Sequence, residues 1–567
     1  MASPTLTQPS YSSSMADKPL LGMTIGDKFD QIATQYADND ALIVLHQNIH
    51  WSYRQLQEEV NRCARALLSI GVNKGDRVAI WAPNCSEWTL TQFATAKIGA
   101  ILVNINPSYR THELEYALNQ SGARFLVTAN SFKSSDYSAM LYELAPELKA
   151  SNDGELKSQK LPDLECIINL SSEKLSGMWR WSDLMEEANK VSQTDVDDLQ
   201  ATLQFDDAIN IQYTSGTTGF PKGATLSHHN ILNNGFFVAE SMGFTSEDRL
   251  VIPVPLYHCF GMVMGNLGCM THGATMIYPD EGFDPGKVLK AVHEQKATAL
   301  YGVPTMFIAE LEHEGFASTD FSTLRTGIMA GSICPAEIMK QVISKMNMKG
   351  VQIAYGMTET SPVSTQTGAN DSIEKRVSTV GRTQPHLENK IVDPGNGGIL
   401  PRGEIGELCT RGYSVMLKYW NNDKATAEAI DEAGWMHTGD LATMDEEGYI
   451  QIVGRIKDMV IRGGENVYPK EIEEFLYAHP AISEVQVTGV PDKKYGEELI
   501  AWVKLNSTAG EVTGEELREY CKGKITHFKI PRYFKFVDEF PMTVTGKIQK
   551  FKMREISIQE LGLDQES

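Results

Sequence analysis

The amino-acid sequence predicts an α/β fold, with helices covering mainly parallel sheets, followed by a smaller α+β unit. Two observations lead to this prediction. Short, continuously apolar segments alternate with segments of helical periodicity over most of the chain, which is typical of helix-covered parallel sheets. After about residue 450 the strands lie between short helices instead, and we expect a separate unit of about 110 residues there.

Residues 51–72 predict an amphipathic helix. Ser52 and Gln55 have the spacing of a capping box. The apolar residues after them recur at helical intervals and form one stripe: Leu56, Val60, Cys63, Ala64 and Leu67. Buried strands are predicted at 77–83, 100–105, 125–129, 250–254, 274–278 and 327–331. In the C-terminal unit we expect strands at 446–455, 485–490, 498–505 and 533–540.

Charge and composition exclude several classes of protein. The formal net charge of −22 argues against a general nucleic-acid binder. No stretch approaches the roughly 20 apolar residues of a membrane-spanning helix. The eight cysteines form no CxxC pair, so the sequence suggests neither a zinc site nor a disulfide framework, and a reducing, cytoplasmic location is expected. Residues 1–22 are rich in Ser, Thr and Pro and lack the apolar core of a secretory signal, so they are predicted to be a disordered lead-in.

One segment runs against the acidic composition. Residues 518–555 contain ten Lys and Arg against four acidic residues, a local charge of +6. This segment is either an ordinary solvated face or a place where an anion is handled.

The loop 213–223, YTSGTTGFPKG, offers backbone N–H groups and hydroxyls with little side-chain bulk. Glycine permits close approach of the backbone to a ligand, and a concave run of N–H donors suits phosphate oxygens. Lys222 adds a positive charge, and Pro221 stiffens its approach. The common GxxxxGK[ST] phosphate loop does not fit this sequence. Taken alone, the loop is either a phosphate cradle or a flexible surface loop.

Two further groups of residues have a chemical reading of their own. Glu359 lies between Thr358 and Thr360, an oxygen set that suits Mg²⁺, although a surface turn with an exposed glutamate would look the same. Asp440 and Arg455 are both able to bind a ribose diol, or they form a structural pair. Residues 444–453 between them read as a hairpin, which would bring the two side chains together.

A resemblance to a known family supports the hypothesis that the loop 213–223 is a phosphate cradle. YTSGTTGFPKG resembles the phosphate-loop motif of the adenylate-forming superfamily of acyl-CoA synthetases, luciferases and peptide-synthetase adenylation domains. YGMTETSP at 355–362, HTGDLA at 437–442, GRIKDMVIRGGENVYPKEIE at 455–473 and TVTGKIQK at 543–550 resemble its later motifs, in the same order. The overall pattern looks closest to medium-chain acyl-CoA synthetases of the "family member 2" type.

The resemblance implies a set of ATP-binding residues. Tyr355 would lie against the adenine, Thr358 near the α-phosphate, and Asp440 and Arg455 at the ribose, while Thr214 and Glu359 would hold Mg²⁺. Lys547 would be the catalytic lysine of adenylation, with Lys222 near the leaving pyrophosphate. The full implied ATP set is Thr214, Ser215, Gly216, Thr217, Thr218, Gly219, Phe220, Pro221, Lys222, Gly331, Ser332, Tyr355, Gly356, Met357, Thr358, Asp440, Arg455 and Lys547.

The acyl and CoA sites are implied by the same resemblance. His258 and Phe260 would lie at the mouth of an acyl tunnel, where His258 serves as a gate or positioning residue rather than as a proton-transfer base. Gly261 and Gly331 would leave room for the chain, and methionines between 255 and 278 suit an adaptable lipid surface, although buried core is the alternative. Gly463 and Gly464 would admit the pantetheine arm of CoA, and Lys457 is the matching hinge position.

The implied protein is an ATP-dependent acyl-CoA synthetase acting on medium to long aliphatic acids. Its substrates are a fatty acid, ATP and CoA, with Mg²⁺ as cofactor, no nucleic-acid partner and a possible homodimer. The implied N-terminal domain covers 23–456, with sheet-and-helix layers and a small β-barrel-like part, and a mobile domain covers 457–567. Three alternatives stay open: an aryl-acid CoA ligase, a carrier-protein-loading acyl-AMP ligase, and a non-catalytic nucleotide-binding member of the family.

Overall fold

The computed structural model describes residues 8–214, 221–331, 334–463, 465–506, 510, 512–542 and 548–563. The chain forms two compact units. The larger unit comprises Ser12–Asn389 and Thr410–Met436, and the smaller unit comprises Met1–Tyr11, Lys390–Cys409 and His437–Ser567. Neither division falls between 456 and 457, so the predicted domain boundary there stays a prediction.

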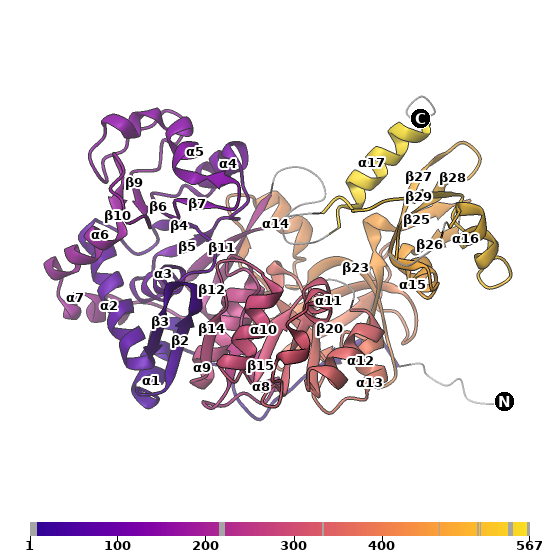
Figure 1. Cartoon of the computed structure of the whole chain (residues 1–567), viewed down its shortest axis with the longest axis horizontal. Coiled ribbons are helices and arrows are strands. Elements are labelled where there is room, and N and C mark those ends of the chain that lie inside the picture. The colour runs from indigo at the N-terminus through magenta and orange to yellow at the C-terminus, as the bar shows by residue number, and fades with distance from the viewer. Residues whose placement is uncertain are drawn as a thin grey trace. The chain divides into compact units, whose positions relative to one another are not determined.

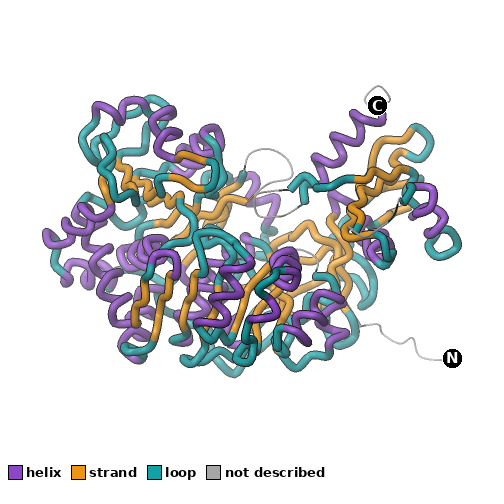
Figure 2. The backbone as a smooth tube through the Cα atoms, viewed as in Figure 1, coloured by secondary structure: helices purple, strands orange, loops and turns teal. Residues whose placement is uncertain are grey.

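The larger unit contains two large sheets, seen as the strand-rich regions of Figure 2. In sheet order, the eight-stranded sheet contains β10 (Trp179–Arg180), β9 (Cys166–Asn169), β6 (Phe125–Thr128), β4 (Arg77–Trp81), β5 (Ile101–Asn104), β11 (Ala208–Thr214), β12 (Lys222–Ser227) and β22 (Lys418–Tyr419). The nine-stranded sheet contains β19 (Arg382–Thr383), β18 (Val363–Gln366), β17 (Gly350–Gly356), β16 (Thr326–Ala330), β15 (Ala299–Gly302), β13 (Arg249–Val251), β14 (Thr275–Tyr278), β2 (Asp40–Val44) and β3 (Ile49–Ser52).

The helices of the larger unit surround these sheets (Figure 1). They are α1 (Ile25–Gln35), α2 (Tyr53–Ser69), α3 (Ser86–Ile98), α4 (Thr111–Ser121), α5 (Tyr137–Leu144), α6 (Trp181–Glu187), α7 (Gln193–Gln200), α8 (His228–Ser241), α9 (Gly268–His272), α10 (Pro285–Glu294), α11 (Pro304–Glu312), α12 (Ala336–Lys345), α13 (Ile373–Ser378) and α14 (Asp423–Ala429). A π-helix, η4 (Phe260–Leu267), precedes α9, and a short 3₁₀ helix, η6 (Thr358–Thr360), follows β17.

Both sheets are mainly parallel, as predicted, and both faces are buried. From β10 to β11 all neighbours in the eight-stranded sheet run parallel, and the same holds from β17 to β2 in the nine-stranded sheet. Side chains alternate across β4: Val78 and Ile80 join the core cluster that holds α2 and α3, whereas Ala79 and Trp81 join the cluster that holds α4 and α5. Burial on both faces explains why these strands read as continuous apolar runs.

The predicted helix at 51–72 forms as α2. Ser52 accepts a hydrogen bond from the backbone N–H of Gln55, and the Gln55 side chain accepts one from the N–H of Ser52, which completes the capping box. The predicted stripe from Leu56 to Leu67 is fully buried. Among the described residues, no helix has both the length and the apolar character needed to cross a membrane.

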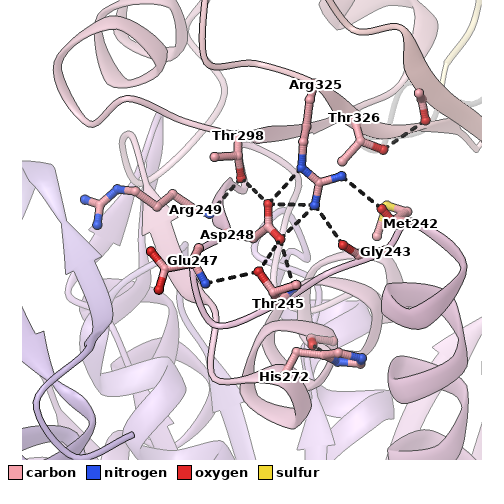
Figure 3. A network of polar contacts seen from close by, with 12 residues as sticks. Met242, Gly243, Thr245, Glu247, Asp248, Arg249, His272, Thr298, Arg325 and Thr326 are labelled. Carbon is pink, nitrogen blue, oxygen red and sulfur yellow. Dashed lines mark hydrogen bonds and ion pairs between the residues drawn. The ribbon is translucent and has the colours of Figure 1, made fainter.

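A carboxylate ties the start of β13 to the starts of β15 and β16 in the nine-stranded sheet (Figure 3). Asp248, just before β13, accepts hydrogen bonds from the guanidinium of Arg325 and from the hydroxyl of Thr298, which precede β16 and β15. The same Arg325 also donates to the carbonyls of Met242 and Gly243 after α8. The Asp248 carboxylate, with Arg325 and Thr298, therefore joins the starts of three central strands to the end of a helix.

In the described residues, the smaller unit holds one complete sheet, most of a second one and three α-helices. It holds most of a five-stranded sheet in the order β1 (Tyr11–Ser13), β20 (Leu387–Val392), β21 (Gly406–Gly412), β23 (Met436–Met444) and β24 (Ile450–Arg455). The other sheet contains β26 (Glu465–Val467), β25 (Val460–Arg462), β28 (Gly496–Leu505), β27 (Ile482–Asp492) and β29 (Tyr533–Phe536). Its helices are α15 (Pro469–Tyr477), α16 (Gly514–Cys521) and α17 (Lys550–Leu561). The predicted α+β character is confirmed, while the barrel-like part stays a prediction.

The disordered lead-in predicted for residues 1–22 is wrong from residue 8 onward. Ser10 donates from its backbone N–H to Leu400 O and from its hydroxyl to Pro401 O. Leu21 donates to the side chain of Asn233 at 2.7 Å, and that side chain donates back to Leu21 O at 3.1 Å. A Ser- and Pro-rich composition gave no sign of these partners because they lie more than two hundred residues away in the sequence. Residues 1–7 are outside the described residues.

Glu310 provides a test of the core of the larger unit. Its carboxyl is fully buried in α11 and makes no hydrogen bond to the described residues, and burial raises its pKa well above the ordinary 4.5. Above pH 4.5 the unfolded chain therefore loses a proton that the folded chain retains, and stability falls as pH rises, by at most about 1.4 kcal/mol per pH unit. We predict that Glu310→Met raises the thermal unfolding midpoint, and does so more at pH 8 than at pH 5.

The matched control is Glu312→Met, because Glu312 is exposed at the end of the same helix. Its effect should be small at both pH values. Equal shifts of the midpoint for Glu310→Met at pH 5 and pH 8 would contradict the assignment of a buried, protonated carboxyl.

Candidate functional site

The two ends of the predicted phosphate loop are fixed by paired strands. Thr214 at the end of β11 faces Lys222 at the start of β12, and the Thr214 hydroxyl donates to Lys222 O at 3.3 Å. The carbonyl of Pro221 accepts a hydrogen bond from Tyr116 at 3.0 Å. Six predicted loop residues lie outside the described residues: Ser215, Gly216, Thr217, Thr218, Gly219 and Phe220. The structure thus places the base of the loop in a hairpin of two strands, and a helix, α8, begins only after the second strand.

The motif at 355–362 lies where β17 ends. Gly356 is required there, because a Cβ at this position would lie 1.7 Å from Pro362 O. The backbone N–H of Met357 donates to the same carbonyl at 3.0 Å, which closes a tight turn. Tyr355 ends up half-buried at the strand end, and Thr358 begins the following 3₁₀ helix.

Glu359 is a buried carboxylate in that 3₁₀ helix, only 5% exposed. One of its oxygens, Oε1, accepts a hydrogen bond from the phenol of Tyr419 at 2.7 Å. The other, Oε2, is bonded by none of the described residues. Burial and the neighbouring carboxylate raise the pKa of Tyr419 above its usual range, so the phenol keeps its proton and donates it.

Tyr419 is a residue that the sequence reasoning missed. Its ring lies 4.4 Å from the ammonium of Lys222, measured from Nζ to the ring centroid. It therefore contacts two residues that the sequence predicted independently, Lys222 and Glu359. The sequence run 418–420 has no periodicity and no motif spacing, and only the pairing of β22 with β12 brings Tyr419 to this place.

The predicted acyl segment is mostly core. Gly261 begins the buried part of the π-helix η4, and Met262 and Met264 within that helix are at most 2% exposed. A Cβ at Gly261 would lie 2.5 Å from Pro255 O, so this glycine is explained by close backbone packing. Close backbone packing is thus a sufficient reason for a glycine at position 261. Its place in an acyl pocket stays a prediction.

The other predicted acyl residues are near the surface of that core. The His258 ring lies 4.2 Å from that of Tyr257, and the Phe260 ring lies 5.2 Å from that of Tyr301. Gly331 follows β16 with a φ of 92°, a conformation that favours glycine. Ser332 lies outside the described residues.

Asp440 and Arg455 come together in the smaller unit, as the predicted hairpin requires. They are direct partners in the antiparallel pairing of β23 and β24, and Arg455 Nε lies 3.1 Å from Asp440 Oδ1. The Asp440 side chain is 12% exposed, whereas that of Arg455 is 56% exposed. The pair presents one acceptor and one flexible donor on the same sheet edge, which suits a vicinal diol.

Glu407 anchors the part of β23 that carries Asp440, and it too was missed. Its carboxylate accepts hydrogen bonds from His437 Nδ1 at 2.8 Å and from the backbone N–H of Gly439 at 3.1 Å. The sulfur of Cys409 lies 3.5 Å from the same His437 nitrogen. In the described part of the chain, Glu407, Cys409 and His437 are a group whose possible ligand atoms all lie within 4.8 Å of one another. The two hydrogen bonds explain this arrangement without a metal ion.

The remaining predicted residues lie in the last part of the chain. Gly463 has a φ of 62°, and its N–H donates to Tyr495 O at 2.8 Å. Lys457 is exposed within a 3₁₀ turn, Ile456–Asp458, directly after β24. Gly464 and Lys547 lie outside the described residues.

The basic segment 518–555 is largely compensated. Among its described residues, seven cations form ion pairs: Arg518–Glu515, Lys522–Glu519, Lys529–Glu471, Arg532–Asp492, Lys535–Glu560, Lys550–Glu473 and Arg554–Glu497. Six of these acidic partners lie outside the segment. In the described part of this segment, most of the positive charge is therefore compensated by acidic partners.

Comparisons with known proteins agree with the predicted motifs. A family model described as "AMP-binding enzyme" matches residues 29–420, and one described as "AMP-binding enzyme C-terminal domain" matches residues 471–547. The chain is 53% identical to a putative acyl-CoA synthetase, YngI, of Bacillus subtilis over 96% of this chain and 99% of the relative. It is 45% identical to the medium-chain acyl-CoA ligase ACSF2, mitochondrial, of Danio rerio over 99% of this chain and 92% of the relative.

Two solved structures resemble this one over nearly the whole chain. ATP-bound MatB from Rhodopseudomonas palustris has a TM-score of 0.80 and 30% identity, covering 94% of this chain and 99% of that one. The anthranilate CoA ligase AuaEII in complex with anthranoyl-AMP has a TM-score of 0.83 and 26% identity, covering 96% and 99%.

The anchoring role of Glu407 leads to a prediction. Glu407→Ala removes the acceptor of the Gly439 N–H and of His437, and a hydrogen bond of about 1 kcal/mol corresponds to about fivefold in local opening. We expect the peptide containing residues 437–440 to exchange its amide hydrogens about fivefold faster, measured by mass spectrometry. Glu404→Ala is the matched control, because Glu404 is exposed and two residues before β21. Equal exchange in both variants would show that Glu407 does not stabilise this part of β23.

Proposed function

The chain belongs to the AMP-binding enzyme family, and from that membership we propose that it is an AMP-forming acyl-CoA synthetase for medium to long aliphatic acids. In the first step the acid carboxylate attacks the α-phosphate of ATP, which gives acyl-AMP and pyrophosphate. In the second step the CoA thiol attacks the acyl carbonyl, which gives acyl-CoA and releases AMP. The observation that carries the proposal is the 53% identity to a putative acyl-CoA synthetase over nearly the full chain.

The larger unit would supply the phosphate and adenine contacts. Tyr355 at the end of β17 would lie against the adenine, and Thr358 would donate to the α-phosphate. Lys222 and the loop before it would hold the leaving pyrophosphate, because preorganised cations and N–H donors stabilise charge that develops in the transition state. Asp440, as an acceptor, and Arg455, as a donor, would bind the hydroxyls of the ribose; the two side chains lie 3.1 Å apart.

Thr214 and Glu359 are the proposed ligands of Mg²⁺. A buried carboxylate with one oxygen bonded by Tyr419 and the other unbonded by the described residues fits a hard, oxygen-binding cation. When bound, the ion would neutralise charge on the phosphates of ATP. The residues of the chain do the rest: they bind the nucleotide, orient its α-phosphate and hold the products apart.

The acyl preference is the finer part of the proposal. His258 and Phe260 would lie at the mouth of the acyl site, with Gly331 beside the bound carboxylate. The solved relative AuaEII is named as a ligase for anthranilate, which is an aryl acid, and it has the same fold. The fold alone therefore does not discriminate between aliphatic and aryl acids. The name of the Danio rerio relative, a medium-chain ligase at 45% identity, favours the aliphatic reading.

The second half-reaction would use the C-terminal residues 457–567. Gly463 and Gly464 would admit the pantetheine arm of CoA, and Lys457 would be the pivot about which this domain moves between the two steps. Lys457 lies between β24, which carries Arg455, and β25, which precedes Gly463, as a pivot between these functions must.

Location and assembly are also proposed. All eight cysteines are free and buried, which is consistent with a reducing compartment, and we propose the cytoplasm. The word "mitochondrial" belongs to the name of the fish relative. We also propose a homodimer, which a measurement of the molecular mass in solution would test.

The substrate proposal is tested by a pyrophosphate-release screen with acetate, octanoate, decanoate, palmitate and benzoate. We predict that octanoate or decanoate gives a kcat/KM at least tenfold above that of acetate, since each buried methylene contributes about 0.8 kcal/mol. Pyrophosphate release without CoA consumption would favour carrier loading, and no release with any acid would favour a non-catalytic protein. The highest kcat/KM with benzoate would favour the aryl-acid alternative.

The role of Lys547 is tested by separating the half-reactions. We predict that Lys547→Ala slows acyl-AMP formation by about 10²–10³-fold, the usual cost of removing one preorganised donor from a transition state. Thioester formation from supplied acyl-AMP should change much less. Lys552→Ala is the control, because Lys552 is exposed five residues later. If Lys547→Ala slows both half-reactions equally, Lys547 has no specific role in adenylation.

A further inference from the structure

Tyr419 stands between two oppositely charged side chains of the proposed nucleotide site. Its hydroxyl donates to Glu359 Oε1 at 2.7 Å, and the Lys222 ammonium lies over its ring at 4.4 Å. Lys222 and Glu359 make no ion pair with each other in the described part of the chain. The Tyr419 side chain therefore contacts an anion through its hydroxyl and a cation through the face of its ring.

The backbone fixes Tyr419 in this place. Its strand, β22, pairs with β12, where Tyr419 faces Ala224. On one side of Tyr419 the N–H of Met416 donates to Glu359 O at 2.9 Å, and on the other the N–H of Trp420 donates to Gly223 O at 2.7 Å. The segment 416–420 is thus bonded both to the helix that carries Glu359 and to the strand that carries Lys222. The Tyr419 side chain itself is buried, only 3% exposed as a residue.

We propose that Tyr419 is a positioning residue that keeps Glu359 and Lys222 apart and directs Glu359 Oε2 toward the metal–nucleotide complex. This inference rests on the proposed function, because it takes Glu359 as a metal ligand and Lys222 as a phosphate contact. The sequence motifs and the comparisons assign no role to Tyr419.

The physical reason is competition between charges. A lysine and a buried glutamate that contact the same side chain attract one another, and an ion pair between them would occupy both groups before a nucleotide binds. A hydrogen bond from a phenol to a carboxylate is charge-assisted and fixes the carboxylate plane. The face of the same ring attracts the ammonium, and this holds Lys222 on its own side. Groups that orient a metal ligand in this way typically change metal affinity by about 10–100-fold when removed.

The test measures metal binding directly. Full-length protein is saturated with α,β-methylene-ATP, which is not cleaved at the α-phosphate, and is titrated with Mn²⁺, whose unbound form is followed by electron paramagnetic resonance. We expect Tyr419→Phe, which keeps the ring and removes the hydroxyl, to weaken Mn²⁺ binding about tenfold. Tyr419→Leu, which removes the ring as well, should weaken it further. Steady-state assays should show a higher Mg²⁺ requirement for Tyr419→Phe, with kcat largely recovered at saturating Mg²⁺.

The control is Tyr142→Phe, which removes a phenol that donates only to a backbone carbonyl, Ser176 O, at the surface of α5. It should bind Mn²⁺ as the parent does, and thermal unfolding should show that both Phe variants are folded. Parent-like Mn²⁺ affinity in Tyr419→Phe, or an equal loss in Tyr142→Phe, would overturn the inference alone. A parent protein that binds no Mn²⁺ and makes no acyl-CoA would overturn the inference together with the proposed function.

Discussion

The pairing of β22 with β12 is the constraint on which the candidate site depends. β22 consists of two residues, yet it lies between the strand that begins with Lys222 and the helix that carries Glu359. Hydrogen bonds from Met416 to Glu359 O and from Trp420 to Gly223 O join all three. Without this short strand, the lysine and the carboxylate would be held only by their own segments, and a 3₁₀ helix of three residues has little rigidity of its own.

The buried sheets hold in place the short segments that carry the candidate site residues. β4 and β5 are covered on both faces, and β11, which leads into the phosphate loop, pairs with β5. Residues at the ends of such strands are held in defined positions, because a close-packed interior resists displacement. The polar network of Asp248 and Arg325 fixes the starts of three central strands of the nine-stranded sheet.

The sequence predicted what depends on local pattern. The capping box of Ser52 and Gln55 and the stripe of α2 follow from spacing, and the meeting of Asp440 with Arg455 follows from a hairpin. It did not predict Tyr419, because the contacts of that residue come from parts of the chain about 60 and 200 residues away, which spacing does not encode. Gly261 shows a different limit: the sequence shows that a side chain is absent, but not whether backbone or ligand fills its place.

A protein with a net charge of −22 repels ATP at long range unless positive charge gathers near the binding site. Seven cations of the segment 518–555 are paired, mainly with acids from elsewhere in the same unit, so little long-range attraction comes from it. Exposed pairs such as Lys522–Glu519 contribute about 0–1 kcal/mol each and are screened by salt. In the proposed function, recognition of the phosphates would then come from direct contacts such as that of Lys222, which lies over the ring of Tyr419. Selectivity by placed donors depends on geometry and not on net charge. The residues that fix the geometry, Tyr419 at Glu359 and Glu407 at Gly439, therefore matter as much as the residues that would touch the nucleotide.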